Sequence, residues 1–171
     1  MQLNNIFNYL INKPQKNMKK VFLFLAILLA VNSVQSQTAA KSIYAELGGP
    51  SLAGINFDMR FNKKEDGLGG RVGIGGFQID GEGAFFFPVG LNYLIGKDQK
   101  NYFEVGAGAT FVNVTGNAIS GDFSSTFGHL SLGYRYQPAK GGFLFRAAVT
   151  PIFGKGFFIP YFAGISFGYK F

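Results

Sequence analysis

Apolar side chains recur at every second position along eight separate stretches of this 171-residue chain, beginning at Ile43 and ending at Phe171. An apolar period of two is typical of a β-strand whose two faces meet different surroundings. Gly75-Gly76 breaks the alternation in the third stretch, and Phe77 and Ile79 continue it one residue late, which predicts a β-bulge. The apolar members of the eight predicted strands are Ile43, Ala45, Leu47; Ile55, Phe57, Met59, Phe61; Val72, Ile74; Phe85, Phe87, Val89, Leu91, Tyr93; Phe103, Val105, Ala107, Ala109, Phe111; Leu130, Leu132, Tyr134, Tyr136; Phe143, Phe145, Ala147, Val149; and Ala163, Ile165, Phe167, Tyr169, Phe171.

The positions between these apolar residues hold small and charged side chains. The charged residues that fall inside predicted strands all belong to this second set: Glu46, Asp58, Arg60, Arg71, Glu104, Arg135, Arg146 and Lys170. In a soluble sandwich this set would face water, where Lys, Glu and Thr are favoured over Gly. In a transmembrane barrel it would face a narrow lumen, which takes polar and very small residues. All 25 glycines lie after residue 36, and many fall in this set, so the composition favours the barrel over the sandwich.

The N-terminal segment, residues 1 to 36, has the organisation of a secretory signal peptide. Four lysines and no acidic residue precede or border the eleven-residue apolar run from Val21 to Val31, and a small-residue exit follows at Val34-Gln35-Ser36. A retained anchor helix is the alternative, but such a helix needs about 20 apolar residues to span a bilayer. Met18-Lys19-Lys20 is itself an ordinary signal-peptide start, so we hypothesise that residues 1–17 are an over-extended gene start.

Charge and composition exclude several classes of protein. Without the four lysines of the leader, 12 basic and 9 acidic residues remain, a net charge of +3. No part of residues 37–171 combines a basic cluster with interleaved aromatics, so nucleic acid is not an expected partner. The chain has no Cys, which excludes disulfides, Cys-ligated metals and a Cys nucleophile, and its single His gives no metal-ligand spacing with acidic residues. We therefore expect no metal and no cofactor.

The lengths of the connections indicate how the strands are arranged. If both termini lie on the periplasmic side, that side carries three short charged turns, at residues 62–67, 96–100 and 137–142. The other side carries connections at residues 48–51, 80–83 and 153–156, together with the longest connection, from about Thr115 to Thr126. Short periplasmic turns and longer outer loops are typical of outer-membrane barrels.

The chain ends as a strand, and its last residue is aromatic. Phe167, Tyr169 and Phe171 alternate with polar residues to the C-terminus, which resembles the terminal strand signal of bacterial outer-membrane proteins. Together with Glu46-Leu47-Gly48-Gly49-Pro50 and Gly54-Ile55-Asn56-Phe57-Asp58, this makes the predicted barrel domain, residues 37–171, similar over about residues 41–171 to the small OmpA-like or OmpW-like outer-membrane barrels. The predicted fold class is all-β: an eight-stranded antiparallel up-and-down transmembrane β-barrel. The resemblance implies a monomer in a bacterial outer membrane, in contact with lipid and with the barrel-assembly machinery, and it supplies no catalytic residues.

Two candidate sites remain in the second set of positions. The seven charged residues from Glu46 to Arg146 are expected to form a paired network that plugs the lumen, with Glu104 and Arg135 close enough to pair directly; a gated path for ions or solutes is the alternative. His129 and Ser131 have the His-x-Ser spacing of outer-membrane lipid A deacylases. Our assignment points both inward, however, and an orienting acid would have to be Glu104 or Asp122.

Three functions are therefore considered. The first is a non-enzymatic barrel with a structural or surface-interaction role, whose outer loops, chiefly residues 115–126 with Phe123 and the adjacent Phe127, meet envelope or external partners. The second is a narrow conduit for small or apolar solutes. The third is a lipid-modifying hydrolase that uses Ser131 and His129. We predict the first, because no motif in the sequence supplies a complete catalytic site.

Overall fold

The computed structural model describes residues 39–79, 82–115 and 126–171. The predicted signal peptide, Asp122 and Phe123 lie outside these ranges. Within them, no helix is both long enough and apolar enough to span a membrane. Most of the described chain is strand, as the alternating pattern predicts.

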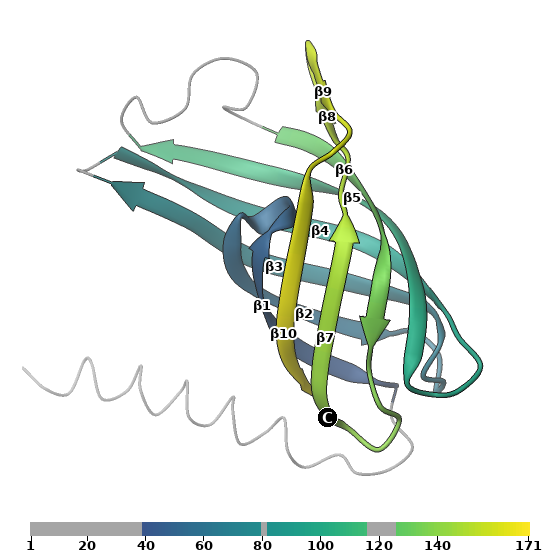
Figure 1. The fold of residues 1–171 in the computed structure, drawn as a ribbon. Coiled ribbons are helices and arrows are strands. Elements are labelled where there is room, and N and C mark those ends of the chain that lie inside the picture. Colours follow the sequence, from purple (N-terminus) through teal and green to yellow (C-terminus); the bar gives the residue numbers. More distant parts are fainter. Residues whose placement is uncertain (1–38, 80–81, 116–125) are drawn as a thin grey trace, which may run out of the picture. The chain divides into compact units, whose positions relative to one another are not determined.

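Eight antiparallel strands form a closed barrel (Figure 1). Each strand pairs with the next along the chain, β5 pairs with β6, and the ring closes where β1 pairs with the last strand, β10, in the register Ile43 opposite Tyr169. A closed ring leaves no second sheet to form a sandwich, so the predicted barrel is confirmed. The barrel strands are β1 (Lys41–Gly48), β2 (Ala53–Arg60), β3 (Gly67–Ile79), β4 (Glu82–Ile95), β5 (Asn101–Thr115), β6 (Thr126–Tyr136), β7 (Gly142–Val149) and β10 (Ala163–Lys170).

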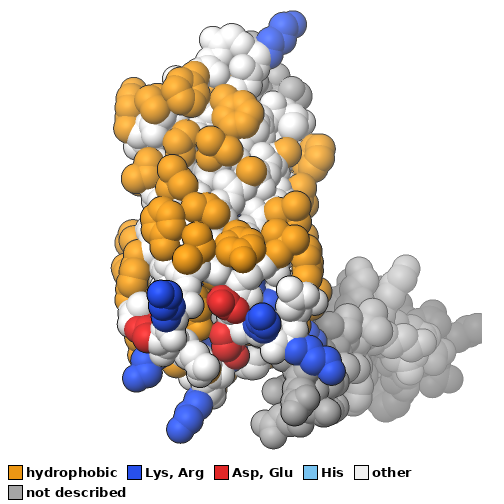
Figure 2. All heavy atoms as spheres, turned by 90° about the vertical axis from the view of Figure 1, so that its right-hand side faces the viewer, with side chains coloured by type: hydrophobic (Ala, Val, Ile, Leu, Met, Phe, Trp, Pro, Cys, Tyr) orange, Lys and Arg blue, Asp and Glu red, His pale blue; other side chains and the backbone are white. Residues whose placement is uncertain are grey.

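The two predicted faces are also confirmed. Outward side chains such as Val72 and Phe103 are about half exposed, at 53% and 52%, whereas Arg60 and Glu104 are 0% and 2% exposed inside the barrel. Figure 2 shows apolar side chains over much of the face in view, with most of the Lys, Arg, Asp and Glu side chains of that face at the lower end. The barrel therefore has an apolar outside and a polar inside, the reverse of a water-soluble protein.

The predicted bulge in the third strand is wrong. β3 keeps one register with β4 from Leu68 opposite Tyr93 to Phe77 opposite Ala84, with no inserted residue. Opposite residues of an antiparallel pair point to the same face, so Phe77 lies on the inner side with the buried Ala84. The ladder is interrupted only beside Pro88 of β4, because proline has no N–H to donate.

A bulge occurs instead just before the eighth barrel strand, at Pro160-Tyr161. β8 (Ile152–Gly154) and β9 (Phe157–Ile159) form a hairpin that continues β7 and β10 beyond the barrel wall (Figure 1). Thr150 N–H donates to Phe162 O at 2.6 Å, while Ile152 is opposite Ile159. One residue on the first strand therefore opposes two on the second, which is the definition of a bulge. The outer connection predicted at residues 153–156 is therefore shorter in the structure, where it is only the turn between β8 and β9.

The connection between β1 and β2 folds into the barrel rather than over its rim. It consists of η1 (Gly49–Ser51), whose three residues are all buried. Gly48 enters this turn with φ of 74°, and a Cβ at this position would lie 2.3 Å from Ala163 O, so only glycine fits. Further toward the long-loop end the interior becomes apolar, with a buried cluster made of Ala84, Phe86, Phe127 and Ile152.

Candidate functional site

The seven predicted charged residues meet inside the barrel as one continuous chain of ion pairs. Basic and acidic groups alternate along it from one end to the other, and each contacts its neighbours within 3.4 Å. In order, the members are Arg60, Asp58, Arg135, Glu104, Arg146, Glu46 and Arg71. The residues come from six of the eight barrel strands, so the network ties opposite parts of the wall together.

Glu104 of β5 is the centre of this network. Arg146 binds it with two groups, Nη2 to Oε1 at 2.6 Å and Nε to Oε2 at 3.0 Å. Arg135 Nη1 donates to Oε2 at 3.4 Å, so the predicted Glu104–Arg135 pair is present, although it is the weaker of the two. Arg135 also reaches Asp58 through Nη2 at 3.1 Å.

The two ends of the chain differ in their surroundings. Arg60 contacts Asp58 at 2.7 Å and donates through Nη1 to Gly67 O at 2.8 Å, and the amide of Asn92 binds both Arg60 and Asp58. At the other end, Arg71 Nη1 donates to Glu46 Oε1 at 3.3 Å. The two Nη groups of Arg60 thus have several acceptors and only its Nε lacks a partner among the described residues, whereas the one acceptor of Arg71 in this part of the chain is Glu46.

Tyr44 completes the centre of the lumen. Its ring is 1% exposed and lies against two guanidinium groups, with Arg146 Cζ 5.0 Å and Arg135 Cζ 6.0 Å from the ring centroid. Cation–π contacts of this kind are strengthened when the partners are desolvated. Tyr44 belongs to the second set of positions, and its role was missed because an uncharged aromatic carries no pairing signal in the sequence.

His129 and Ser131 are not hydrogen-bonded to each other. Both point inward and are 3% and 6% exposed. His129 Nδ1 lies 3.3 Å from Thr110 Oγ1, and Ser131 Oγ has no hydrogen-bond partner among the described residues, His129 included. A seryl nucleophile needs a base within hydrogen-bond reach, and this contact is not present.

The described residues contain no group of three or more acidic, His or Cys side chains placed to hold a metal ion.

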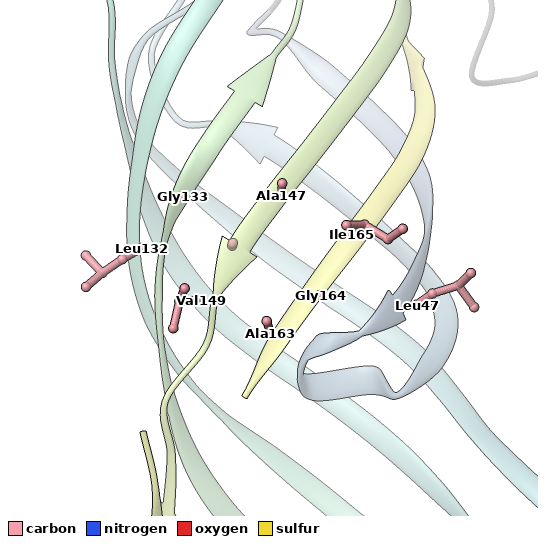
Figure 3. A pocket seen from close by; sticks show the side chains of 9 residues that line it. Leu47, Leu132, Gly133, Ala147, Val149, Ala163, Gly164 and Ile165 are labelled. Carbon is pink, nitrogen blue, oxygen red and sulfur yellow. The ribbon is translucent and has the colours of Figure 1, made fainter. Parts of the chain in front are cut away.

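The hollow shown in Figure 3 lies on the outer face, where small residues of β7 and β10 lie between larger apolar ones. Leu47, Ala147 and Ile165 are among its lining residues, and none of the nine carries a polar side chain. The side chains that line the hollow can therefore make apolar contacts, but none of them can act as a catalytic group or a metal ligand.

The predicted C-terminal signal residues lie on the outer face. Phe167, Tyr169 and Phe171 are 47%, 57% and 42% exposed. Phe167 packs against Phe145 of β7, with ring centroids 5.4 Å apart. Their outward position agrees with the predicted alternation, and their recognition by assembly machinery stays a prediction.

Three solved structures are similar to this chain. The N-terminal β-barrel domain of OprF from Pseudomonas aeruginosa superposes with a TM-score of 0.56 at 16% identity, covering 80% of this chain and 100% of that domain. Ail from Yersinia pestis gives a TM-score of 0.50 at 14% identity, over 78% of this chain and 98% of Ail. The outer-membrane enzyme PagL gives 0.42 at 15% identity, over 75% and 96%.

No protein-family model and no curated protein sequence matches the chain. At identities of 14% and 16%, the matches with Ail and OprF establish the fold alone. In fold, the chain is an eight-stranded barrel of the OmpA-like type, as its sequence resemblance implies.

Proposed function

We propose that this chain is a non-enzymatic integral protein of a bacterial outer membrane, exported by a signal peptide and acting as a monomeric structural or surface-interaction barrel. The observation that carries the proposal is the inversion of its two surfaces. The outside carries an extended apolar band, which is unfavourable in contact with water, and the inside holds buried charged side chains joined in ion pairs. Ail, which shares the fold, is an outer-membrane protein.

The filled interior argues against a conduit. The interior holds the ion-pair chain, the three buried residues of η1 and the buried apolar cluster around Phe86. Lys170 of β10 also binds Glu65 in the β2–β3 turn at 2.6 Å. An ion or solute would have to displace several buried groups, each costly to leave unpaired.

The interior position of His129 and Ser131 argues against a hydrolase in the same way. A lipid substrate would meet the barrel from the outside, whereas both side chains face the lumen behind the wall. We expect cells with the Ser131→Ala protein to have the same lipid A acyl pattern as the wild type. The test is made under conditions where deletion of the gene alters this pattern.

The β8–β9 hairpin supports a surface-interaction role. It projects beyond the barrel at the long-loop end (Figure 1), and it exposes Phe158 by 63%. Tyr161, in the bulge at its base, is 82% exposed. Exposed aromatic side chains of this size supply contact area for a partner or for a membrane interface.

The first experiment is fractionation of the producing cell, followed by gel mobility of the extracted protein with and without boiling. A closed barrel that unfolds slowly resists SDS until heated and runs as a compact species. We expect the protein in the outer-membrane fraction with a heat-dependent shift. A soluble periplasmic protein that shows no shift would contradict the proposal.

Conductance across planar bilayers then separates the structural role from the conduit. The purified barrel is expected to pass no steady current, because its lumen is filled. Reproducible unitary currents from the wild-type protein would favour the conduit instead.

A further inference from the structure

The alternating network inside the barrel has an uncompensated charge. It begins and ends with an arginine, so four guanidinium groups face three carboxylates and the network carries a net charge of +1. Every member is at least 94% buried. A buried charge without a counter-charge is expensive, so the excess positive charge calls for a negative partner.

The excess charge is least compensated at Arg71. The guanidinium of Arg60, at the opposite end, is held by Asp58, by Asn92 and by the carbonyl oxygen of Gly67. Arg71 has one ion pair, Nη1 to Glu46 at 3.3 Å, and Glu46 is shared with Arg146. Arg71 Nη2 is buried and has no partner among the residues that the structure describes.

A small internal cavity of about 10 Å³ adjoins Arg71. Ser131 lines it too, and its buried Oγ is the second polar atom there without a partner in the described part of the chain. A cavity of this size admits about one atom-sized ligand. Arg71 Nη2 and Ser131 Oγ are thus two hydrogen-bond donors without acceptors, and both residues line a cavity with room for one small acceptor.

The other polar groups of the lining are already engaged. Both carboxylate oxygens of Glu104 accept hydrogen bonds from Arg146 or Arg135, so the negative charge of Glu104 is offset by two cations. Asn92 is bound to Asp58 and Arg60, and His129 contacts Thr110. None of these engaged side chains supplies the negative charge that Arg71 Nη2 lacks.

Glycines keep this space open. Gly90 is opposite Arg71, and Gly106 is opposite Ser131. A Cβ on Gly106 would lie 3.5 Å from Ser131 Cβ, so a larger residue there would fill the cavity.

We propose that the barrel binds one small monovalent anion, a halide such as chloride, between Arg71 Nη2 and Ser131 Oγ. The anion completes the alternation of charges and makes the interior neutral. The proposal goes beyond the function proposed above and does not depend on it, because it rests on groups inside the barrel.

The first test measures stability against halide concentration. The barrel is refolded in detergent, and its urea unfolding midpoint is followed as chloride replaces gluconate at constant ionic strength, since gluconate is too large for the cavity. We expect the midpoint to rise with chloride. Ser131→Ala should weaken the apparent chloride affinity about tenfold, as loss of a hydrogen bond to a charged group predicts. Arg71→Gln should abolish the chloride dependence.

Ser166→Ala is the matched control. Ser166 is buried and bonded to Arg146 at 3.2 Å, but it does not line the cavity, so its chloride dependence should equal that of the wild type. The proposal would be overturned if the unfolding midpoint of Ser131→Ala depended on chloride as strongly as that of the wild type. A wild-type unfolding midpoint that does not change with chloride would also overturn it.

The second test is a crystal structure of the wild-type barrel grown in bromide. An anomalous peak within hydrogen-bond distance of Arg71 Nη2 and Ser131 Oγ is the expected result. A water molecule at this position without anomalous signal would refute halide binding, even if Arg71→Gln proves too unstable to measure.

Discussion

Arg135 and Arg146 lie directly opposite each other on β6 and β7, with both guanidinium groups inside the barrel. Two like charges in opposite positions destabilise a pair of strands. Here Glu104 of β5 accepts from both, at 3.4 Å from Arg135 and 2.6 Å from Arg146. A carboxylate from a third strand therefore makes this pairing of arginines possible.

Removal of the charge on Glu104 should destabilise the barrel strongly. Glu104→Gln keeps the shape of the side chain but leaves two buried guanidinium groups facing each other, and loss of one partner in a buried pair costs about 3–5 kcal/mol. Urea unfolding of the refolded protein measures the change. Asp66→Asn, which removes the same charge in the β2–β3 turn, is the control and should have little effect; equal midpoints for the two variants would show that the network contributes no stability.

A charge on the apolar band should be costly only if that band meets lipid. Val72 lies midway along β3 and is 53% exposed. Val72→Arg should cost about 2–4 kcal/mol in lipid vesicles, the range for Arg at a bilayer midplane. Refolding yield and unfolding midpoint in vesicles measure it, with Asn62→Arg in the polar β2–β3 turn as the control. A cost near zero would indicate that water surrounds this face.

Gly69 is required because Arg60 lies over it. A Cβ at Gly69 would lie 2.2 Å from Arg60 Cζ, and Arg60 is held in place by Asp58 and Gly67 O. Gly69→Ala should therefore lower stability by about 1–3 kcal/mol, as overpacking does. In a double-mutant cycle with Arg60→Ala, Gly69→Ala should become nearly neutral; additive effects would disprove the steric explanation.

Asp98 organises the turn between β4 and β5. Its carboxylate accepts from the backbone N–H of Asn101 at 2.7 Å, from the Asn101 side chain and from the backbone N–H of Lys100 at 3.0 Å, and these hydrogen bonds lower its pKa to about 2. Because the folded pKa lies below the unfolded value of about 3.9, the stabilisation is present above that value and is lost as pH falls toward 2. NMR titration of the folded barrel checks the pKa; a value near 4 would show that the turn does not hold the carboxylate.

The terminal aromatic should matter for assembly more than for stability. Phe171 is 42% exposed on the outer face, so Phe171→Ser leaves the charged network inside the barrel untouched. We expect less assembled protein in the outer membrane of cells, by heat-shift assay, and nearly unchanged refolding of the purified variant into vesicles. An equal loss in both assays would indicate a structural role instead.

Much of the architecture could be predicted from local sequence. Alternate residues of a strand point to opposite faces, so the position of Arg60 or Val72 inside or outside the barrel follows from its place in the alternation. The membership of the charged network was predictable for the same reason. The bulge at Gly75-Gly76 was predicted wrongly because the change of phase marks side chains that turn inward at the loop end, such as Phe77.

The sequence by itself determined the number of barrel strands, their two faces and the set of charged side chains inside the lumen. Only the tertiary structure decided which charges meet, that η1 turns inward, and that the bulge falls at Pro160-Tyr161. Strand pleating is a local property of the backbone, whereas the pairing of Asp58 with Arg135, 77 residues apart, depends on the register with which the ring closes. That register is set by the packing of all eight strands together, so no single segment encodes it.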